Sequence, residues 1–157
     1  MQIRIGVFET NSSSSHSLVI SRGKMNLDTL KPVNGKIMSS GGEFGWENDT
    51  YYSPQKKLDY LVSFLFQNAN SYEKVQEIKW KDKRFQMLSD VIYEHCGYKL
   101  EVCKNKDLEY SDWCPYGYID HNSSDLPEKE NLFSAKSVIA AFLFNPNSSI
   151  TTGNDNE

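Results

Sequence analysis

Three segments with apolar residues at helical spacing constrain the fold most, because each has recognisable start or stop signals. The predicted helices span about residues 54–68, 82–96 and 135–144. Ser53-Pro54 is a typical helix start, with serine as the N-cap and proline at the first helical position. Gly97 fits a C-cap of the second helix. Ser134 is the expected N-cap of the third helix, and Pro146 ends it.

Short apolar or alternating segments between these helices predict strands. They lie at residues 2–8, 18–20, 98–104, 116–120 and 149–152. Residues 22–52 hold five of the nine glycines, so we expect turns with room for a hairpin rather than helix there. The chain has 157 residues and no recognisable linker. We therefore predict an α+β fold: one compact domain over residues 1–157, with a small, mainly antiparallel sheet and about three helices.

The net charge and the hydropathy of the chain make nucleic acid and membranes unfavourable as partners. The formal net charge is −4, and no segment forms a basic block, which is unfavourable for a protein that binds mainly phosphates. Direct binding to nucleic acid is therefore the weakest hypothesis. The N-terminus lacks the apolar core of a signal peptide, and no apolar stretch approaches the roughly 20 residues that span a bilayer. We expect a cytoplasmic protein that does not bind membranes.

The cysteines agree with a reducing compartment. Their number is odd, and Cys96, Cys103 and Cys114 form no C-x-x-C pair. Cys96 and Cys103 are predicted to be buried structural thiols.

The first candidate site is the polar segment 9–17, which lies between two apolar runs. Its hydroxyl and amide side chains disfavour regular structure. Histidine is the residue type whose unperturbed side chain titrates near neutrality, so His16 could act as an acid, a base or a metal ligand, with Glu9 as an orienting carboxylate. The alternative is a polar surface turn with an incidental histidine.

The second candidate is segment 117–125, where Asp120, His121 and Ser123 follow a predicted strand end. Asp120 and His121 can converge only if the strand stops at Ile119 or Asp120, because neighbouring strand residues face opposite ways. The alternative is a turn that closes a hairpin.

Two weaker candidates are glycine-containing. Segment 41–47 places glycines around Phe44 and Trp46, which indicates a close backbone approach to a ligand or to the protein's own core. It is not a phosphate-binding P-loop, because no Gly-Lys-Ser/Thr follows. The terminal segment 153–157 is by default a frayed end. His95 follows the apolar stripe of the second predicted helix and is interpreted as a packed or capping residue.

These four segments together resemble a known family. FETNSSSSHS (8–17) is similar to the N-terminal signature of a family of small uncharacterised proteins from bacteriophages and prophage-carrying bacterial genomes. GEFGW (42–46), IDH (119–121) and GNDN (153–156) resemble further pieces of that family. The resemblance implies a phage or mobile-element protein acting in a bacterial cytoplasm, and it implies no particular reaction. It favours convergence of the polar loops over a linker.

The first functional hypothesis is an interaction protein that occupies a host protein, such as a component of a defence system of the CRISPR type. Two acidic stretches support this hypothesis, one at residues 43–49 and one at residues 107–112. Aromatic residues beside carboxylates suit a surface that meets a basic groove. The alternative is that both stretches are solvated loops. Under either hypothesis the binding surface is predicted to include the following residues: Asn11, Ser12, Ser13, Glu43, Trp46, Ser123, Asn154 and Asp155.

The second hypothesis is a small hydrolase or transferase acting on a nucleotide or phosphoester. His16 and His121 would be the acid/base pair, and Glu9, Asp120 and Asp155 would orient them or bind a metal. Asn11 and Ser13 would contact an oxyanion or phosphate. No cofactor is expected apart from a possible divalent metal, for which no ligand pair shows a recognised spacing.

Overall fold

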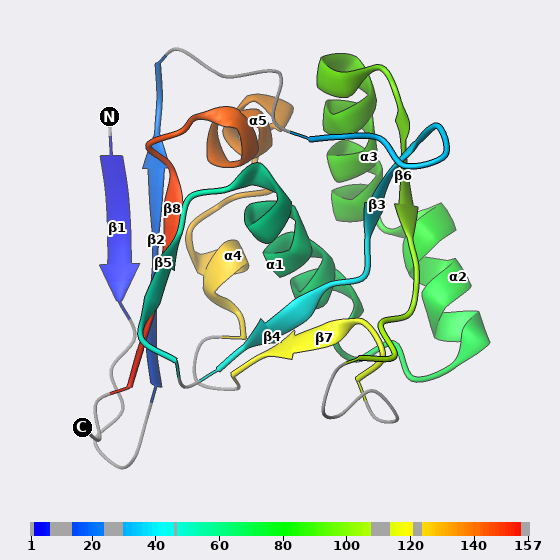
Figure 1. The fold of residues 1–157 in the computed structure, drawn as a ribbon, viewed down its shortest axis with the longest axis horizontal. Coiled ribbons are helices and arrows are strands. Elements are labelled where there is room, and N and C mark those ends of the chain that lie inside the picture. The colour runs from blue at the N-terminus through cyan, green and yellow to red at the C-terminus, as the bar shows by residue number, and fades with distance from the viewer. Residues whose placement is uncertain are drawn as a thin grey trace.

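The computed structural model describes residues 2–6, 14–23, 30–45, 47–107, 114–120 and 124–154. Within these residues the chain forms five helices and eight strands (Figure 1). The helices are α1 (Pro54–Phe66), α2 (Tyr72–Lys81), α3 (Lys83–Cys96), α4 (Leu126–Lys129) and α5 (Lys136–Phe144). The strands are β1 (Gln2–Gly6), β2 (Ser14–Ser21), β3 (Lys36–Ser39), β4 (Gly42–Phe44), β5 (Asp49–Tyr51), β6 (Lys99–Val102), β7 (Gly117–Ile119) and β8 (Ser149–Asn154).

The largest sheet has four strands in the order β1-β2-β8-β5, and all its neighbouring pairs are antiparallel. The strand nearest the C-terminus, β8, therefore lies inside the sheet. Two further pairs, β3 with β6 and β4 with β7, are parallel. The α+β class with a mainly antiparallel sheet is confirmed.

Helix α1 passes between the four-stranded sheet and the α2–α3 side of the molecule (Figure 1). It also packs against α5, whose seven residues from Val138 to Phe144 are all buried. One buried cluster joins these elements. Its largest fully buried apolar or aromatic side chains include Leu18, Ile37, Phe44, Leu58, Tyr60, Leu61, Phe66, Leu88, Ile92, Phe142 and Phe144.

The parallel pair β4–β7 lies so close to α1 that glycine is required in it. Gly117 has φ +82°, and a Cβ there would lie 2.1 Å from the carbonyl oxygen of Gly42 and 2.6 Å from Ser63 Oγ. Ser63 Oγ accepts a hydrogen bond from the Gly42 N–H at 2.8 Å and lies 3.0 Å from the Tyr116 carbonyl oxygen. One serine of α1 thus fixes the separation of the helix from both strands.

The three predicted helices are present with nearly the predicted bounds. The Lys56 N–H donates to Ser53 Oγ at 3.2 Å, as expected of an N-cap, and Gly97 has the left-handed φ of +78°. The predicted cap Ser134 is wrong, because Ala135 occupies the N-cap position and makes no side-chain bond.

Two helices, α2 and α4, were not predicted. The only buried residue of α2 is Val75, while Tyr72 and Trp80 are 79% and 74% exposed. An apolar stripe is therefore almost absent from its sequence. Helix α4 has only four residues, too few for a periodic pattern.

Residues 30–52 contain three strands that pair with distant strands and not with one another. A turn at Asn34-Gly35 closes locally, through a bridge between Val33 and Lys36. The expectation of turns for residues 22–52 was therefore incomplete, since non-local pairing has no signature within the segment.

The cysteines are all free. Cys96 is half-buried against the core, but Cys103 is exposed, so its predicted burial is wrong. The reason is that β6 ends at the buried Val102, and Cys103 follows outside the strand. His95 is packed as predicted: its Nδ1 lies 3.0 Å from the Val91 carbonyl oxygen, and its ring stacks on Phe144 at 5.1 Å.

None of the helices in the described ranges has both the length and the apolar character needed to cross a bilayer.

Candidate functional site

The structure describes only some of the predicted site residues. His16, Glu43 and Asp120 are described with their side chains, and Asn154 is placed in β8. The other predicted site residues lie outside the described residues: Glu9, Asn11, Ser12, Ser13, Trp46, His121, Ser123 and Asp155.

His16 is a strand residue and not a loop residue. Strand β2 begins at Ser14, so the end of the polar segment is extended and pairs with β8. This corrects the prediction of a loop through residue 17. The serine-rich sequence lacks apolar alternation, but sheet pairing satisfies its backbone groups. His16 is only 1% exposed, which a surface turn with an incidental histidine does not explain.

The imidazole of His16 is held by a backbone carbonyl. Its Nε2 lies 2.9 Å from the carbonyl oxygen of Gly45. Since a carbonyl oxygen only accepts hydrogen bonds, Nε2 carries the proton, and in the neutral ring Nδ1 keeps its lone pair. Nδ1 is buried and has no hydrogen-bond partner in the described part of the chain. The ring is thus oriented through one nitrogen, with an acceptor at the other.

The described parts of all four polar segments meet around this histidine. Strands β4 and β7 are parallel, with Phe44 opposite Ile119, so their carboxyl ends reach the same edge. The Asp120 N–H donates to the Phe44 carbonyl oxygen at 2.8 Å, one residue before the Gly45 carbonyl that receives His16. In the sheet, His16 lies opposite Thr152 and Ser14 lies opposite Asn154. Asp120 is buried, at 5% exposure.

Glu47 links the residue after β4 to the last residue of β5. One of its carboxylate oxygens accepts from the Gly45 N–H at 3.1 Å, and the other accepts from the Tyr51 hydroxyl at 3.2 Å. Burial, together with the Glu47 carboxylate, raises the pKa of Tyr51 to about 12. Gly45 therefore has its N–H bound by Glu47 and its carbonyl bound by His16.

Two buried polar residues behind this turn were not predicted. Tyr60 of α1 is fully buried, and its ring packs edge-on against Phe44 at 4.9 Å. Its hydroxyl and both carboxylate oxygens of Glu130 lack hydrogen-bond partners among the described residues. Burial raises the pKa of Glu130. Burial raises the pKa of Tyr60 still more strongly, with further contributions from the negative charges of Asp125 and Glu130.

The sequence holds little signal for these two residues. Tyr60 lies among the apolar residues of α1, where an aromatic ring is interpreted as core. Glu130 lies in a charged, turn-forming stretch where carboxylates are usually solvated.

A metal centre is not evident in the described residues, since no three His, Cys, Asp or Glu side chains among them are grouped as ligands.

The comparisons with known proteins add no relative: no protein-family model, curated protein or solved structure matches this chain. The resemblance of the four polar segments to phage proteins stays a prediction.

Proposed function

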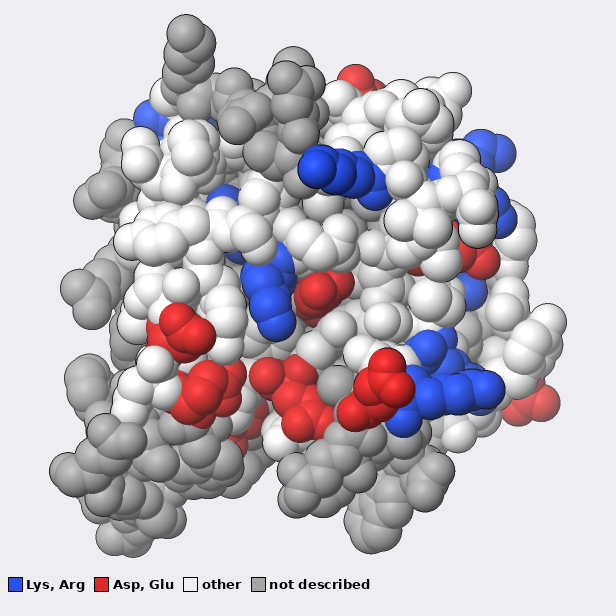
Figure 2. Space-filling model, viewed as in Figure 1, with Lys and Arg blue, Asp and Glu red and all other residues white. Residues whose placement is uncertain are grey.

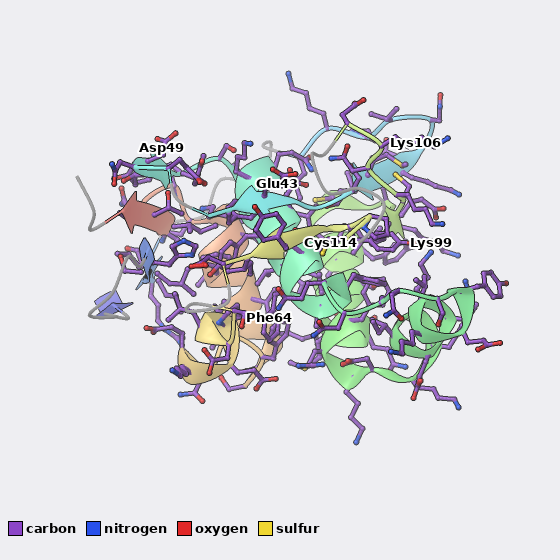
Figure 3. The ribbon with its side chains drawn as sticks, turned by 90° about the horizontal axis from the view of Figure 1, so that it is seen from below. Glu43, Asp49, Phe64, Lys99, Lys106 and Cys114 are labelled. Carbon is purple, nitrogen blue, oxygen red and sulfur yellow. The ribbon has the colours of Figure 1, made fainter. Side chains whose placement is uncertain are left out.

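We propose that this chain is an accessory protein of a phage or mobile genetic element that acts in the host bacterial cytoplasm by binding and interfering with a host protein. The observation that carries this proposal is a group of three acidic residues, here called the acidic edge: Glu43 of β4, Glu47 in the connection that follows, and Asp49 of β5. Acidic side chains form a band across the lower part of the face shown in Figure 2. Glu43 and Asp49 lie on the same side of the molecule (Figure 3).

The carboxylate of Glu47 is held in place by two hydrogen bonds. It accepts from the Gly45 N–H and from the Tyr51 hydroxyl. Tyr52 follows the last residue of β5 and is 55% exposed. An exposed aromatic ring beside a row of carboxylates matches the composition of surfaces that engage basic grooves, because the ring supplies contact area and the charges steer the encounter.

The expected target is therefore a host protein with a basic groove, such as a nucleic-acid-binding component of a defence system. Carboxylates on the acidic edge would occupy positions that the groove offers to phosphates. This role requires no reaction by the protein.

Capture of a host protein by the purified chain tests the acidic edge directly. Wild-type protein is expected to retain a stoichiometric bacterial partner, and the variant Glu43→Gln/Asp49→Asn is expected to lose it. The matched control is Glu73→Gln/Glu77→Gln, which removes the same charge from exposed positions of α2. Equal capture by both variants, or no stoichiometric partner under several salt conditions, contradicts the proposal.

The biological effect is measured as plating efficiency. Expression of the chain in bacteria that carry the partner's defence system is expected to raise the plating of a sensitive phage. The acidic-edge variant is expected to lose this effect while the α2 control keeps it. If the acidic-edge variant still raises the plating of the phage, the binding surface lies elsewhere on the protein.

A second candidate function is a hydrolase or transferase acting on a nucleotide or phosphoester, and the geometry of His16 favours it. An imidazole oriented by a backbone carbonyl with a lone pair left on Nδ1 is the arrangement of a general base. Asp120 is a second buried residue near this histidine, because its N–H donates to the carbonyl oxygen of Phe44, next to Gly45.

The variant His16→Gln separates this chemistry from a structural role. The glutamine amide can still donate to the Gly45 carbonyl oxygen, but it supplies no base at the Nδ1 position. Hydrolysis of a panel of phosphoesters and nucleotides is expected for the wild type and not for the variant, with unchanged melting temperature. The absence of wild-type activity on the panel, or its survival in the variant, excludes this role for His16.

A further inference from the structure

A cavity of about 760 Å³ lies beside α2, away from the residues used above. It is enclosed by the α1–α2 connection, by one side of α2, and by the chain segments that follow β6 and precede β7. Its volume falls within the range of small-molecule sites. Ala69, Val75 and Tyr116 contribute buried apolar surface to it.

The lining of this cavity is basic in a chain that is acidic overall. Lys79, Lys104 and Lys106 line it, and none of the described residues that line it is Asp or Glu. The whole chain has 17 basic and 21 acidic residues, so three lysines without a carboxylate among the described lining residues depart from the average composition of the chain. Figure 2 shows basic side chains gathered at one end of the acidic band, and Lys106 is labelled at that end of the molecule in Figure 3.

The frame that carries these lysines is fixed by hydrogen bonds. The Asn105 N–H donates to the Pro115 carbonyl oxygen at 2.7 Å, which ties the segment of Lys104 and Lys106 to the start of β7. Lys79 Nζ donates to the Val102 carbonyl oxygen at 3.3 Å, so this ammonium group is held near the end of β6. Ammonium groups held at an enclosed surface bind phosphate more strongly than freely solvated ones, because less entropy is lost on binding.

An aromatic ring completes the lining. Tyr72 is the first residue of α2 and is 79% exposed, so its ring is not part of the core. Exposed tyrosine rings stack on nucleobases. Phosphate-binding lysines, apolar surface and a stacking ring together match one class of small ligand.

We propose that this cavity binds a nucleoside phosphate, with the phosphate on Lys79, Lys104 and Lys106 and the base against Tyr72. This site uses neither the acidic edge nor His16, so it is independent of both functions proposed above. The ligand is a small anion with a planar ring, and the site implies no reaction.

Calorimetric titration of the full chain tests the proposal with three probes: adenosine 5′-monophosphate, ribose 5-phosphate and inorganic phosphate. Saturable 1:1 binding of the nucleotide is expected, with weaker binding of ribose 5-phosphate and of phosphate. Lys104→Gln/Lys106→Gln is expected to weaken nucleotide binding at least about tenfold, because each charge-assisted hydrogen bond is worth roughly that factor. Tyr72→Leu is expected to bring the nucleotide down to the affinity of ribose 5-phosphate.

The matched control is Lys81→Gln/Lys83→Gln, which removes the same charge from exposed positions outside the cavity. Nucleotide affinity is expected to be unchanged in this control. The proposal is overturned if the wild type shows no saturable binding, or if both double-lysine variants weaken binding equally. Equal affinity for the nucleotide and inorganic phosphate overturns the assignment of a nucleoside ligand.

Discussion

Lys57 brings an ammonium group into the core. The residue is fully buried, and its Nζ donates to the carbonyl oxygens of Asn145 and Ser148, each at 3.0 Å. Burial lowers its pKa to about 8 from an ordinary value of 10.5. The two carbonyl bonds thus offset only part of the cost of removing the charge from water. This lysine links α1 to the chain that leads into β8.

Stability is expected to depend on pH through Lys57. Between about pH 8 and pH 10.5 the folded state has released the proton that the unfolded state still holds, so the free energy of unfolding rises with pH. Below pH 8 the buried Lys57 stays charged, and the full cost of burying this charge, up to about 3 kcal/mol, lowers the free energy of unfolding. The melting temperature of the wild type should therefore rise relative to that of Lys57→Met between pH 7 and pH 9.5.

Comparison with Lys57→Met is needed because the buried tyrosines lower the free energy of unfolding as the pH rises, whereas Lys57 raises it. Tyr51 and Tyr60 have raised pKa values, so their contribution to stability is lost above about pH 10, where they ionise in the unfolded chain. Both chains share that loss. Parallel pH profiles of the two proteins would show that Lys57 keeps its ordinary pKa.

Single residues also show what the sequence could reveal about the candidate site. His16 stood out by its residue type and position, and the structure places its ring on the carbonyl oxygen of Gly45, next to the Phe44 carbonyl that accepts from the Asp120 N–H. The convergence of the polar loops into one site stays a prediction. Tyr60 and Glu130 did not stand out, because their roles depend on contacts made by residues far away in the chain.

At the scale of elements, the parallel pair β4–β7 depends on close approach of two backbones. Gly117→Ala is expected to destabilise the protein by about 3 kcal/mol or more, since it combines a positive φ with a Cβ 2.1 Å from the Gly42 carbonyl oxygen. The free energy of unfolding from urea titration measures the effect.

Gly35→Ala is the control that isolates backbone strain. Gly35 also has a positive φ, +76°, but a Cβ at this position would have no atom within 4 Å of it. The Gly35→Ala substitution is expected to lower the free energy of unfolding by about 1 kcal/mol. An equal loss of unfolding free energy in Gly117→Ala and Gly35→Ala would show that the close approach of β4 and β7 adds no cost beyond that of the positive φ.

The elements that were predicted are those with local signals. Helix α1 has a serine cap and a proline start, and α3 has a glycine end, so each is recognisable within its own segment. Strands β3, β4 and β5 pair with β6, β7 and β8, and such pairing is determined by the whole fold. Helix α2 was missed because it buries little and exposes two aromatic rings.

At the scale of the whole molecule, the sheet depends on β8. This strand pairs with β2 on one side and with β5 on the other. Ser148, just before it, bonds through its hydroxyl to the Ser21 N–H and to the Ala141 carbonyl oxygen. Removal of β8 therefore leaves β5 without a partner in this sheet and leaves β2 paired with β1 alone.

A chain ending at Asn147 is expected to lose its cooperative thermal transition, because β2 and β5 then lose their pairing with β8. A chain ending at Asn154 keeps every described residue of β8 and is expected to melt as the full chain does. Circular dichroism during heating measures both. A cooperative transition in the shorter chain would show that the remaining elements fold without β8.

The position of β8 also determines when the sheet can form during protein synthesis. The hydrogen bond between Ser21 and Ser148 joins residues 127 positions apart. Ribosomes add roughly 5–20 residues per second, so β2 leaves the ribosome several seconds or more before its partner β8 exists. During that interval one edge of β2 is open to pairing with other chains. A nascent chain of this protein is therefore expected to depend on ribosome-associated chaperones more than its small size suggests.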